Sequence, residues 1–349
     1  MHPTQSNHSL PYLDGWRGLA ICLLLLGHFF PLAGINFGAV GVNLFFVLSG
    51  LLMARLLFVD RVPFARFYKR RVSRIFPAVF FFLAAVVAAY LAIGRPVNWS
   101  EVGFAATFLN NYFPGRPGAA DMPFGHIWSL CVEEHSYVAL SLVALLVRRT
   151  GLNAAAAVGV LALLFAGCGI GYWASYHGEH LEFERWLRSE VMAYAIFASA
   201  FLFLLFHGRR MPATPWWSVP LLLALGVTLH WWSVPAPLRT IAGTGAFALA
   251  INLLANAPQR LHALFAFRPL RQMGLWSFSI YLWQQPFYLL THRSGLPPAA
   301  AMALAIMAGI ASFYLLEQPM RVYLNRKWTP PQTADEKKPL PGERLTGNG

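Results

Sequence analysis

Residues 15–37 read GWRGLAICLLLLGHFFPLAGINF, an apolar stretch long enough to cross a membrane as one helix. Its two basic side chains are Arg17 and His28. Eleven residues at about 100° each return the helix to within roughly 20° of its starting direction, so both side chains share one face, about 16 Å apart along the axis. Because an ionisable group inside a membrane costs roughly 3 kcal/mol even on lenient scales, the pair predicts chemistry within the membrane.

The composition of the whole chain indicates a membrane protein. Hydrophobic residues make up 57% of the 349 residues and charged residues only 12%, which excludes the soluble globular class. The apolar runs are long and continuous rather than short and alternating, which excludes an outer-membrane barrel. We therefore expect an all-α integral membrane protein, built as a bundle of transmembrane helices.

Runs of nearly 20 apolar residues predict about ten spans. Their expected bounds are 15–36, 38–59, 76–94, 127–147, 153–174, 190–207, 216–233, 238–255, 273–291 and 299–316. Three parts follow from these bounds. We expect a cytoplasmic N-terminal segment at 1–12, a transmembrane domain at 13–325 and a disordered cytoplasmic tail, rich in proline and charge, at 326–349.

The basic residues are distributed unevenly around these spans. The net charge is +13, and Lys and Arg gather in the short links that a cytoplasmic N-terminus places on the cytoplasmic side. The link between the second and third spans contains Arg61, Arg66, Lys69, Arg70, Arg71 and Arg74. This asymmetry predicts that both termini are cytoplasmic, and it favours membrane lipids rather than nucleic acid as the partner of the basic charge.

Two interpretations fit the polar groups of the first helix. Asp14 lies three residues before Arg17, so its ion pair with Arg17 either holds the guanidinium in place for chemistry or is an interfacial pair that only sets the depth of the helix. A guanidinium fork suits phosphate, and the deeper imidazole of His28 suits a general base. A single membrane histidine also serves as a hydrogen bond between helices, but the arginine on the same face favours the chemical role.

The basic run FARFYKRRVSRIFP, at 64–77, is a candidate donor-binding segment. Arg71 and Arg74 are three residues apart, so they would share a helix face and could clamp a phosphorylated ligand. Lys69 and Arg70 belong to the same run. Contact with anionic lipid is the alternative role for most of this run. A nucleotide-like cofactor arriving from the cytoplasm fits the arrangement of Arg71 and Arg74.

The segment WSLCVEEHSY, at 128–137, places two carboxylates in the fourth span. Glu133 and Glu134 would lie roughly 10 Å into this helix from the outer side, at about the depth of His28. A carboxylate beside an imidazole orients it and raises its basicity. Since adjacent residues point about 100° apart, we expect one glutamate to face His28 and the other to anchor a neighbouring helix.

Uncharged polar side chains within or at the ends of the predicted spans are candidates for substrate binding. Buried polar groups need partners in lipid, so they either line a cavity or join two helices. The candidates are Asn43, Ser49, Trp128, Tyr281, Gln284 and Gln285.

The cysteines show no sign of metal or disulfide chemistry. Cys22, Cys131 and Cys168 fall within apolar stretches at wide spacing. A thiol buried among apolar side chains is usually inert. We expect three reduced thiols and no metal site.

Taken together, these segments resemble the type 3 membrane acyltransferase family, whose bacterial members often acetylate cell-surface sugars. The matching segments are LDGWRG (13–18) with His28 behind it, GVNLFFVLSG (41–50), RVSR (71–74), WSLCVEE (128–134), SIYLW (279–283) and EQP (317–319). The match extends from Leu13 to Arg321. Two positions depart from the family pattern: Gln284 stands where the family often has His, and His135-Ser136 stands where it often has Gln-Phe.

The resemblance implies acyl-CoA as donor, with acetyl-CoA as the expected form, and a carbohydrate or glycolipid acceptor at the bacterial inner membrane. Polysaccharide-assembly proteins are further expected partners. The implied roles are the catalytic base for His28, donor binding for Arg17, Arg71 and Arg74, and an active-site carboxylate for Glu133 or Glu134. His28 would either deprotonate the acceptor hydroxyl or carry the acyl group covalently.

Other functions stay open at this point. A transporter for a polar solute also uses intramembrane Arg, His and Glu, although no inverted repeat or pair of broken helices is present. A scaffold for polysaccharide assembly would leave the buried charges unexplained. Within the acyltransferase interpretation, the acceptor could be a lipid-linked sugar, lipopolysaccharide, exopolysaccharide or a small molecule.

Overall fold

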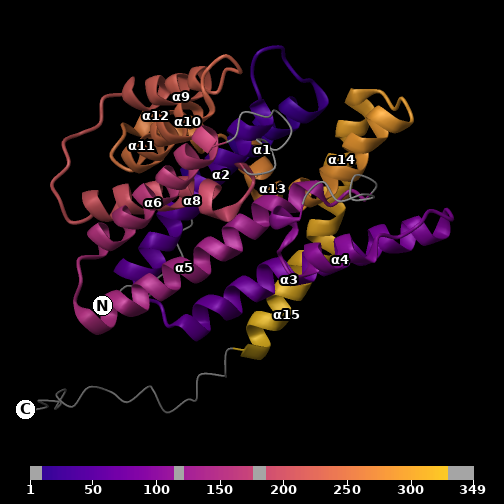
Figure 1. Ribbon diagram of the computed structural model, residues 1–349, viewed down its shortest axis with the longest axis horizontal. Coiled ribbons are helices and arrows are strands. Elements are labelled where there is room, and N and C mark those ends of the chain that lie inside the picture. Colours follow the sequence, from indigo (N-terminus) through magenta and orange to yellow (C-terminus); the bar gives the residue numbers. More distant parts are fainter. Residues whose placement is uncertain (1–9, 114–121, 176–185, 329–349) are drawn as a thin grey trace, which may run out of the picture.

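The regular structure of the chain is helical, with no strand in residues 10–113, 122–175 and 186–328, which the computed structural model describes (Figure 1). The α-helices are α1 (Pro11–Phe29), α2 (Phe37–Ala54), α3 (Phe64–Ala92), α4 (Trp99–Ala106), α5 (Trp128–Thr150), α6 (Ala154–Ser175), α8 (Ser189–Phe206), α9 (Ser218–Leu229), α10 (Ala236–Leu238), α11 (Thr244–Leu254), α12 (Gln259–Phe265), α13 (Arg268–Arg293), α14 (Pro298–Ser312) and α15 (Gln318–Trp328). Short turns of π-helix, η1 (Arg55–Val59), η5 (Arg239–Gly243) and η6 (Phe313–Glu317), extend α2, join α10 to α11 and join α14 to α15. The all-α prediction is confirmed.

Seven helices in the described part of the chain are long and apolar enough to cross a membrane. They are Phe37–Val59, Phe64–Ala92, Gly125–Thr150, Ala154–Ser175, Ser189–Phe206, Ala236–Leu254 and Pro298–Trp328. The remaining predicted spans overlap α1, α9 and α13. Helix α9 has only 12 residues, and the charged side chains of α1 and α13 lower their hydropathy. The count of ten spans and the cytoplasmic termini therefore stay predictions.

Helix α1 packs most extensively against α13 and α2. Glycines permit this close approach: a Cβ at Gly274 would lie 1.8 Å from the carbonyl oxygen of Asp14, and a Cβ at Gly27 would lie 2.1 Å from the amide nitrogen of Gly38. Contacts between small residues replace the hydrophobic effect as the force between helices in lipid. The α1 face that carries Arg17 and His28 is thereby held inside the bundle.

We had expected the basic run at 64–77 to lie mostly in a link between two spans. It lies instead inside helix α3. Arg and Lys are good helix formers, and α3 continues through Pro77, which leaves only one backbone hydrogen bond unmade. The last helix is also longer than predicted, since α15 continues to Trp328 beyond the expected tail boundary at 326. Residues 1–9 and 329–349, which contain most of the predicted terminal segments, lie outside the described residues.

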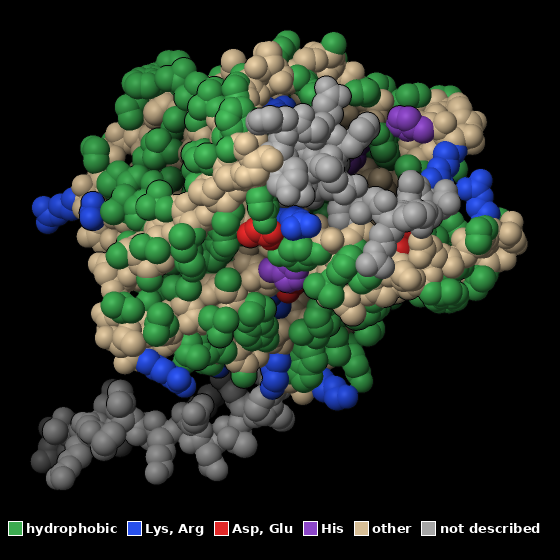
Figure 2. Space-filling view, viewed as in Figure 1, with side chains coloured by type: hydrophobic (Ala, Val, Ile, Leu, Met, Phe, Trp, Pro, Cys, Tyr) green, Lys and Arg blue, Asp and Glu red, His purple; other side chains and the backbone are tan. Residues whose placement is uncertain are grey.

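Apolar side chains are spread across the molecular face in Figure 2, and several Lys and Arg side chains lie along its lower edge. Large apolar side chains such as Leu163 on α6 and Leu315 in η6 are exposed, at 74% and 80% of their surface. Such exposure is expected where the surroundings are lipid rather than water. The fold is that of a multi-pass membrane protein.

Candidate active site

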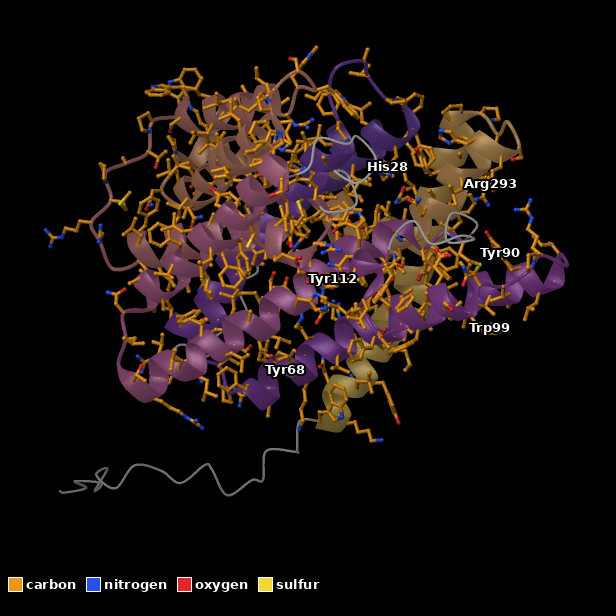
Figure 3. All side chains as sticks on the ribbon, viewed as in Figure 1. His28, Tyr68, Tyr90, Trp99, Tyr112 and Arg293 are labelled. Carbon is orange, nitrogen blue, oxygen red and sulfur yellow. The ribbon has the colours of Figure 1, made fainter. Side chains whose placement is uncertain are left out.

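Two cavities lie inside the bundle and meet at Val42 and Tyr281, which line both. The first, named here the arginine cavity, has a volume of about 110 Å³ and is lined in part by Arg17, Ser49, Arg71, Arg74, Glu133 and Tyr137. The second, named the histidine cavity, has a volume of about 480 Å³ and is lined in part by His28, Asn43, His126, Trp128, His230 and Tyr288. In Figure 3, His28 lies in the upper part of the bundle and Tyr68, from the basic run of α3, in the lower part.

Arg71 is the most tightly held cation of the arginine cavity. Its Nη2 lies 2.6 Å from Oε1 of Glu134, and its guanidinium lies over the ring of Tyr137, 3.4 Å from the ring centroid. Both side chains of the ion pair are largely buried, with 13% and 20% of their surface exposed. Glu134 therefore anchors α3 to α5, as expected for one glutamate of the pair.

Arg17 and Arg74 complete the positive wall of this cavity. Nη1 of Arg17 lies 2.8 Å from Oδ1 of Asp14, so the two side chains form the ion pair that both interpretations of Asp14 contain. Arg74 makes no hydrogen bond or ion pair with the described residues, so its guanidinium is available to a ligand. Lys69 and Arg70 are exposed and line neither cavity, so the structure separates them from Arg71 and Arg74.

Glu133 lies in the arginine cavity, and within the described residues neither glutamate hydrogen-bonds to His28. Glu133 accepts hydrogen bonds from the hydroxyls of Ser49 and Tyr137, the latter at 2.9 Å. The expected pairing of a glutamate with His28 is therefore not what the structure shows. The reason is the order of the helices: α1 presents His28 to α13, whereas the glutamates of α5 meet α2 and α3.

His28 is oriented by an amide instead. Its Nδ1 donates to Oε1 of Gln284 at 2.7 Å, and Nε2 of Gln284 donates to Oε1 of Gln285 at 3.2 Å. These two bonds together place the proton of His28 on Nδ1 and leave Nε2 as the basic nitrogen. A Cβ at Gly38 would lie 3.1 Å from Nε2, so the glycine leaves space beside that nitrogen.

The histidine cavity has walls of aromatic and amide side chains. Nδ2 of Asn43 lies 2.9 Å from Nε2 of His230, whose Nδ1 donates to the carbonyl oxygen of Gly226 at 2.7 Å. Trp128 and Gln285 line the same cavity, and their role in substrate binding stays a prediction. Gln284 is fully buried and supports His28 instead of lining the cavity.

The junction of the two cavities is built around Tyr281. Its hydroxyl donates to the backbone carbonyl of His126 and accepts from the hydroxyl of Ser129 at 2.6 Å. The ring centroids of His126 and Tyr281 lie 5.2 Å apart. Tyr281 is therefore fixed between the two cavities, and it lines both of them.

Sequence reasoning missed several residues of the histidine cavity. His126, two residues before Trp128, was not recognised, although a histidine beside the WSLCVEE segment was visible. His230, Trp232 and Arg239 also line the cavity, and they come from the region between α9 and α11, where no motif marked them. Trp232 is brought there by a backbone hydrogen bond, 2.7 Å long, to the carbonyl oxygen of Gly34 in the loop after α1.

Residues 10–317 match a family model described as an acyltransferase domain, named Acyl_transf_3. BcsY of Komagataeibacter xylinus, named "Putative membrane-bound transacylase", is 27% identical over 337 residues, which cover 90% of this chain and 83% of BcsY. No solved structure matches the chain.

Two further relatives are named as O-acetyltransferases. OatA of Staphylococcus aureus (strain NCTC 8325 / PS 47) is 30% identical over 155 residues, 38% of this chain and 24% of OatA. YrhL of Bacillus subtilis (strain 168), named "Putative peptidoglycan O-acetyltransferase", is 23% identical over 365 residues, 92% of this chain and 56% of YrhL. The match therefore spans about a quarter of OatA and just over half of YrhL.

Proposed function

The chain belongs to the type 3 acyltransferase family, and on this basis we propose that it moves an acetyl group from cytoplasmic acyl-CoA to a hydroxyl of a cell-surface or lipid-linked carbohydrate, in the bacterial inner membrane. The observation that carries this proposal is the pair of cavities that meet at Tyr281, one lined by arginines and the other by His28. A donor and an acceptor that enter from opposite ends would meet at such a junction.

The arginine cavity fits the phosphorylated end of the donor. Arg17, Arg71 and Arg74 present guanidinium groups from two helices, and Arg74 has no protein partner in the described residues. Guanidinium forks bind phosphate with charge-assisted hydrogen bonds. The pantetheine arm of the donor would then extend past Tyr281 and bring the thioester to the histidine cavity.

His28 is the proposed base of the transfer. Gln284 holds Nδ1–H, so Nε2 faces the cavity as a proton acceptor. Nε2 takes the proton of the acceptor hydroxyl while the oxygen attacks the thioester carbon. The C–S bond breaks, and His28 returns the proton to the sulfur of the released CoA. In this direct route no acyl group rests on the protein, and transient acylation of His28 is the other route that the sequence left open.

The histidine cavity fits a sugar. Trp128, Trp232 and Tyr288 offer flat apolar faces. The amides of Asn43 and Gln285 contain both hydrogen-bond donors and hydrogen-bond acceptors. The names of BcsY, OatA and YrhL associate related chains with transacylation and O-acetylation. A small molecule is the alternative acceptor in this proposal. Polysaccharide-assembly proteins are proposed as further partners of the enzyme.

The deciding experiment measures CoA release by the full-length protein in lipid nanodiscs. Wild type should release CoA from acetyl-CoA when given surface glycans from cells that lack the gene, and His28→Ala should not. The glycan should gain 42 Da per acetyl group, by arithmetic of the C2H2O increment alone. Transfer at the wild-type rate by His28→Ala would contradict the role of His28, and solute uptake without CoA release would indicate a transporter.

A further inference from the structure

His126 is a buried histidine whose ring has no hydrogen-bond partner in the described part of the chain. The residue is 5% exposed, and it lines the histidine cavity beside Tyr281. Neither Nδ1 nor Nε2 makes a hydrogen bond, although the backbone of Leu282 lies near the ring. A buried polar atom left unpaired is unfavourable, and this imidazole has two of them.

The ring is nevertheless held in one place. Phe82 meets it edge to face, with ring centroids 5.6 Å apart, and Tyr281 packs on it at 5.2 Å. The backbone carbonyl of His126 accepts the hydroxyl of Tyr281. A polar group that is fixed in advance and left without a partner is what a site needs for stabilising charge that develops in a reaction.

The other histidines of this cavity are different. His28 has Nδ1 bonded to Gln284, and His230 has both nitrogens bonded, to Asn43 and to the carbonyl oxygen of Gly226. Their hydrogen bonds fix which nitrogen carries the proton. His126 lines the histidine cavity beside Tyr281, and neither of its ring nitrogens bonds to the described residues, so a ligand is the expected partner.

We propose that His126 is the electrophilic group of the acyl transfer, donating its N–H to the carbonyl oxygen of the acyl thioester. This inference rests on the proposed function. A neutral imidazole carries one N–H donor and keeps it while it donates. Tyr281 lines both cavities, so a thioester coming from the arginine cavity would first meet His28, the proposed base, near this residue.

The acceptor oxygen bonds to the thioester carbon as Nε2 of His28 takes the hydroxyl proton, and the carbonyl electron pair moves onto the carbonyl oxygen. The N–H of His126 stabilises this oxyanion. The pair then returns to form C=O, the C–S bond breaks, and the thiolate of CoA receives the proton from His28. His126 loses no proton at any point.

Two variants in nanodiscs test the proposal, with acetyl-CoA as donor and glycans from cells that lack the gene as acceptor. His126→Phe keeps a flat ring without an N–H, and His126→Gln keeps an N–H donor. We expect kcat of His126→Phe to fall about 10²–10³-fold, with KM for the glycan and Kd for acetyl-CoA within about threefold of wild type, and His126→Gln to recover about tenfold of the loss.

Stability separates this role from a structural one. His126→Phe removes two unpaired polar atoms, so its melting temperature should equal or exceed that of wild type, whereas a histidine kept for packing would melt lower after substitution. The matched control is His262→Phe. His262 stacks on Tyr12 with ring centroids 4.6 Å apart and lines neither cavity, so this variant should keep the wild-type kcat.

Two results would overturn the inference while the proposed function stands. One is a wild-type kcat in His126→Phe. The other is an unchanged kcat with a raised KM for the glycan, which would assign His126 to acceptor binding. A wild-type protein that releases no CoA with these glycans would contradict the proposed function itself, and the inference with it.

Discussion

Nδ1 of His28 donates a hydrogen bond to Oε1 of Gln284 at 2.7 Å, and this contact joins α1 to α13 across 256 positions of the sequence. The amide nitrogen of Gln284 is occupied by Gln285, so its oxygen is the atom that faces the imidazole. An uncharged side chain thus has the orienting role that we expected of a glutamate. The candidate base is thereby left with Nε2 open to the cavity.

Gln284→Leu should lower kcat roughly ten- to a hundredfold, less than the loss of about 10²–10⁴-fold expected of His28→Ala, which removes general-base catalysis as a whole. Leucine fills similar space but cannot accept the Nδ1–H, so the imidazole loses its fixed tautomer. Gln284→Glu keeps an accepting oxygen and serves as the control, with kcat closer to wild type. CoA release under saturating donor is the measurement. A wild-type kcat in Gln284→Leu would mean that His28 does not need this partner.

Arg74→Ala should weaken acetyl-CoA binding about 10–100-fold, because a hydrogen bond to a charged group contributes about 1.5–3 kcal/mol. Lys69→Ala, from the same basic run, is the matched control because Lys69 is exposed and lines neither cavity. Its Kd should stay near that of wild type. Calorimetric titration of acetyl-CoA into each variant gives both values. Equal effects of the two substitutions would point to general attraction by the basic run instead of a specific site.

Glu134→Ala should destabilise the protein by about 3 kcal/mol, because it leaves Arg71 as a buried charge without its counterion. The exposed pair of Arg55 and Asp60 provides the comparison: these side chains are 50% and 40% exposed and 3.6 Å apart. Asp60→Ala should therefore cost about 0–1 kcal/mol. Melting temperatures in nanodiscs rank the two variants, and a larger drop for Asp60→Ala would reverse the assignment of the structural ion pair.

Gly274→Ala should separate α13 from α1, because its Cβ would lie 1.8 Å from the carbonyl oxygen of Asp14. Overpacking of this kind costs about 1–3 kcal/mol or more. Gly167→Ala on α6 is the matched control, since no atom lies within 4 Å of the added Cβ. There the better helix propensity of alanine should stabilise by up to about 1 kcal/mol. Thermal melting distinguishes the two, and an unaffected Gly274→Ala would show that α1 and α13 are not this close.

Periodicity predicted the parts of the site that lie on one helix. Arg71 and Arg74 are three residues apart, and both line the arginine cavity because three residues of an α-helix nearly complete a turn. Arg17 and His28 share α1 and lie in successive cavities, as their spacing suggested. Contacts between helices were harder to predict. The depth argument for Glu133 and Glu134 considered position along the membrane but not which helices are neighbours.

The sequence by itself determined that this chain is an all-α membrane protein, that its acyltransferase motifs are present, and that the charged candidates of the site come from α1, α3 and α5. Hydropathy and helical periodicity are local properties, so they can be read along the chain. The tertiary structure alone decided that Gln284 orients His28, that Ser49 and Tyr137 hold Glu133, and that His126 lines a cavity while its ring nitrogens have no hydrogen-bond partner in the described residues. Those pairings depend on which helix faces lie against each other, and close packing at glycines far apart in the sequence sets that arrangement.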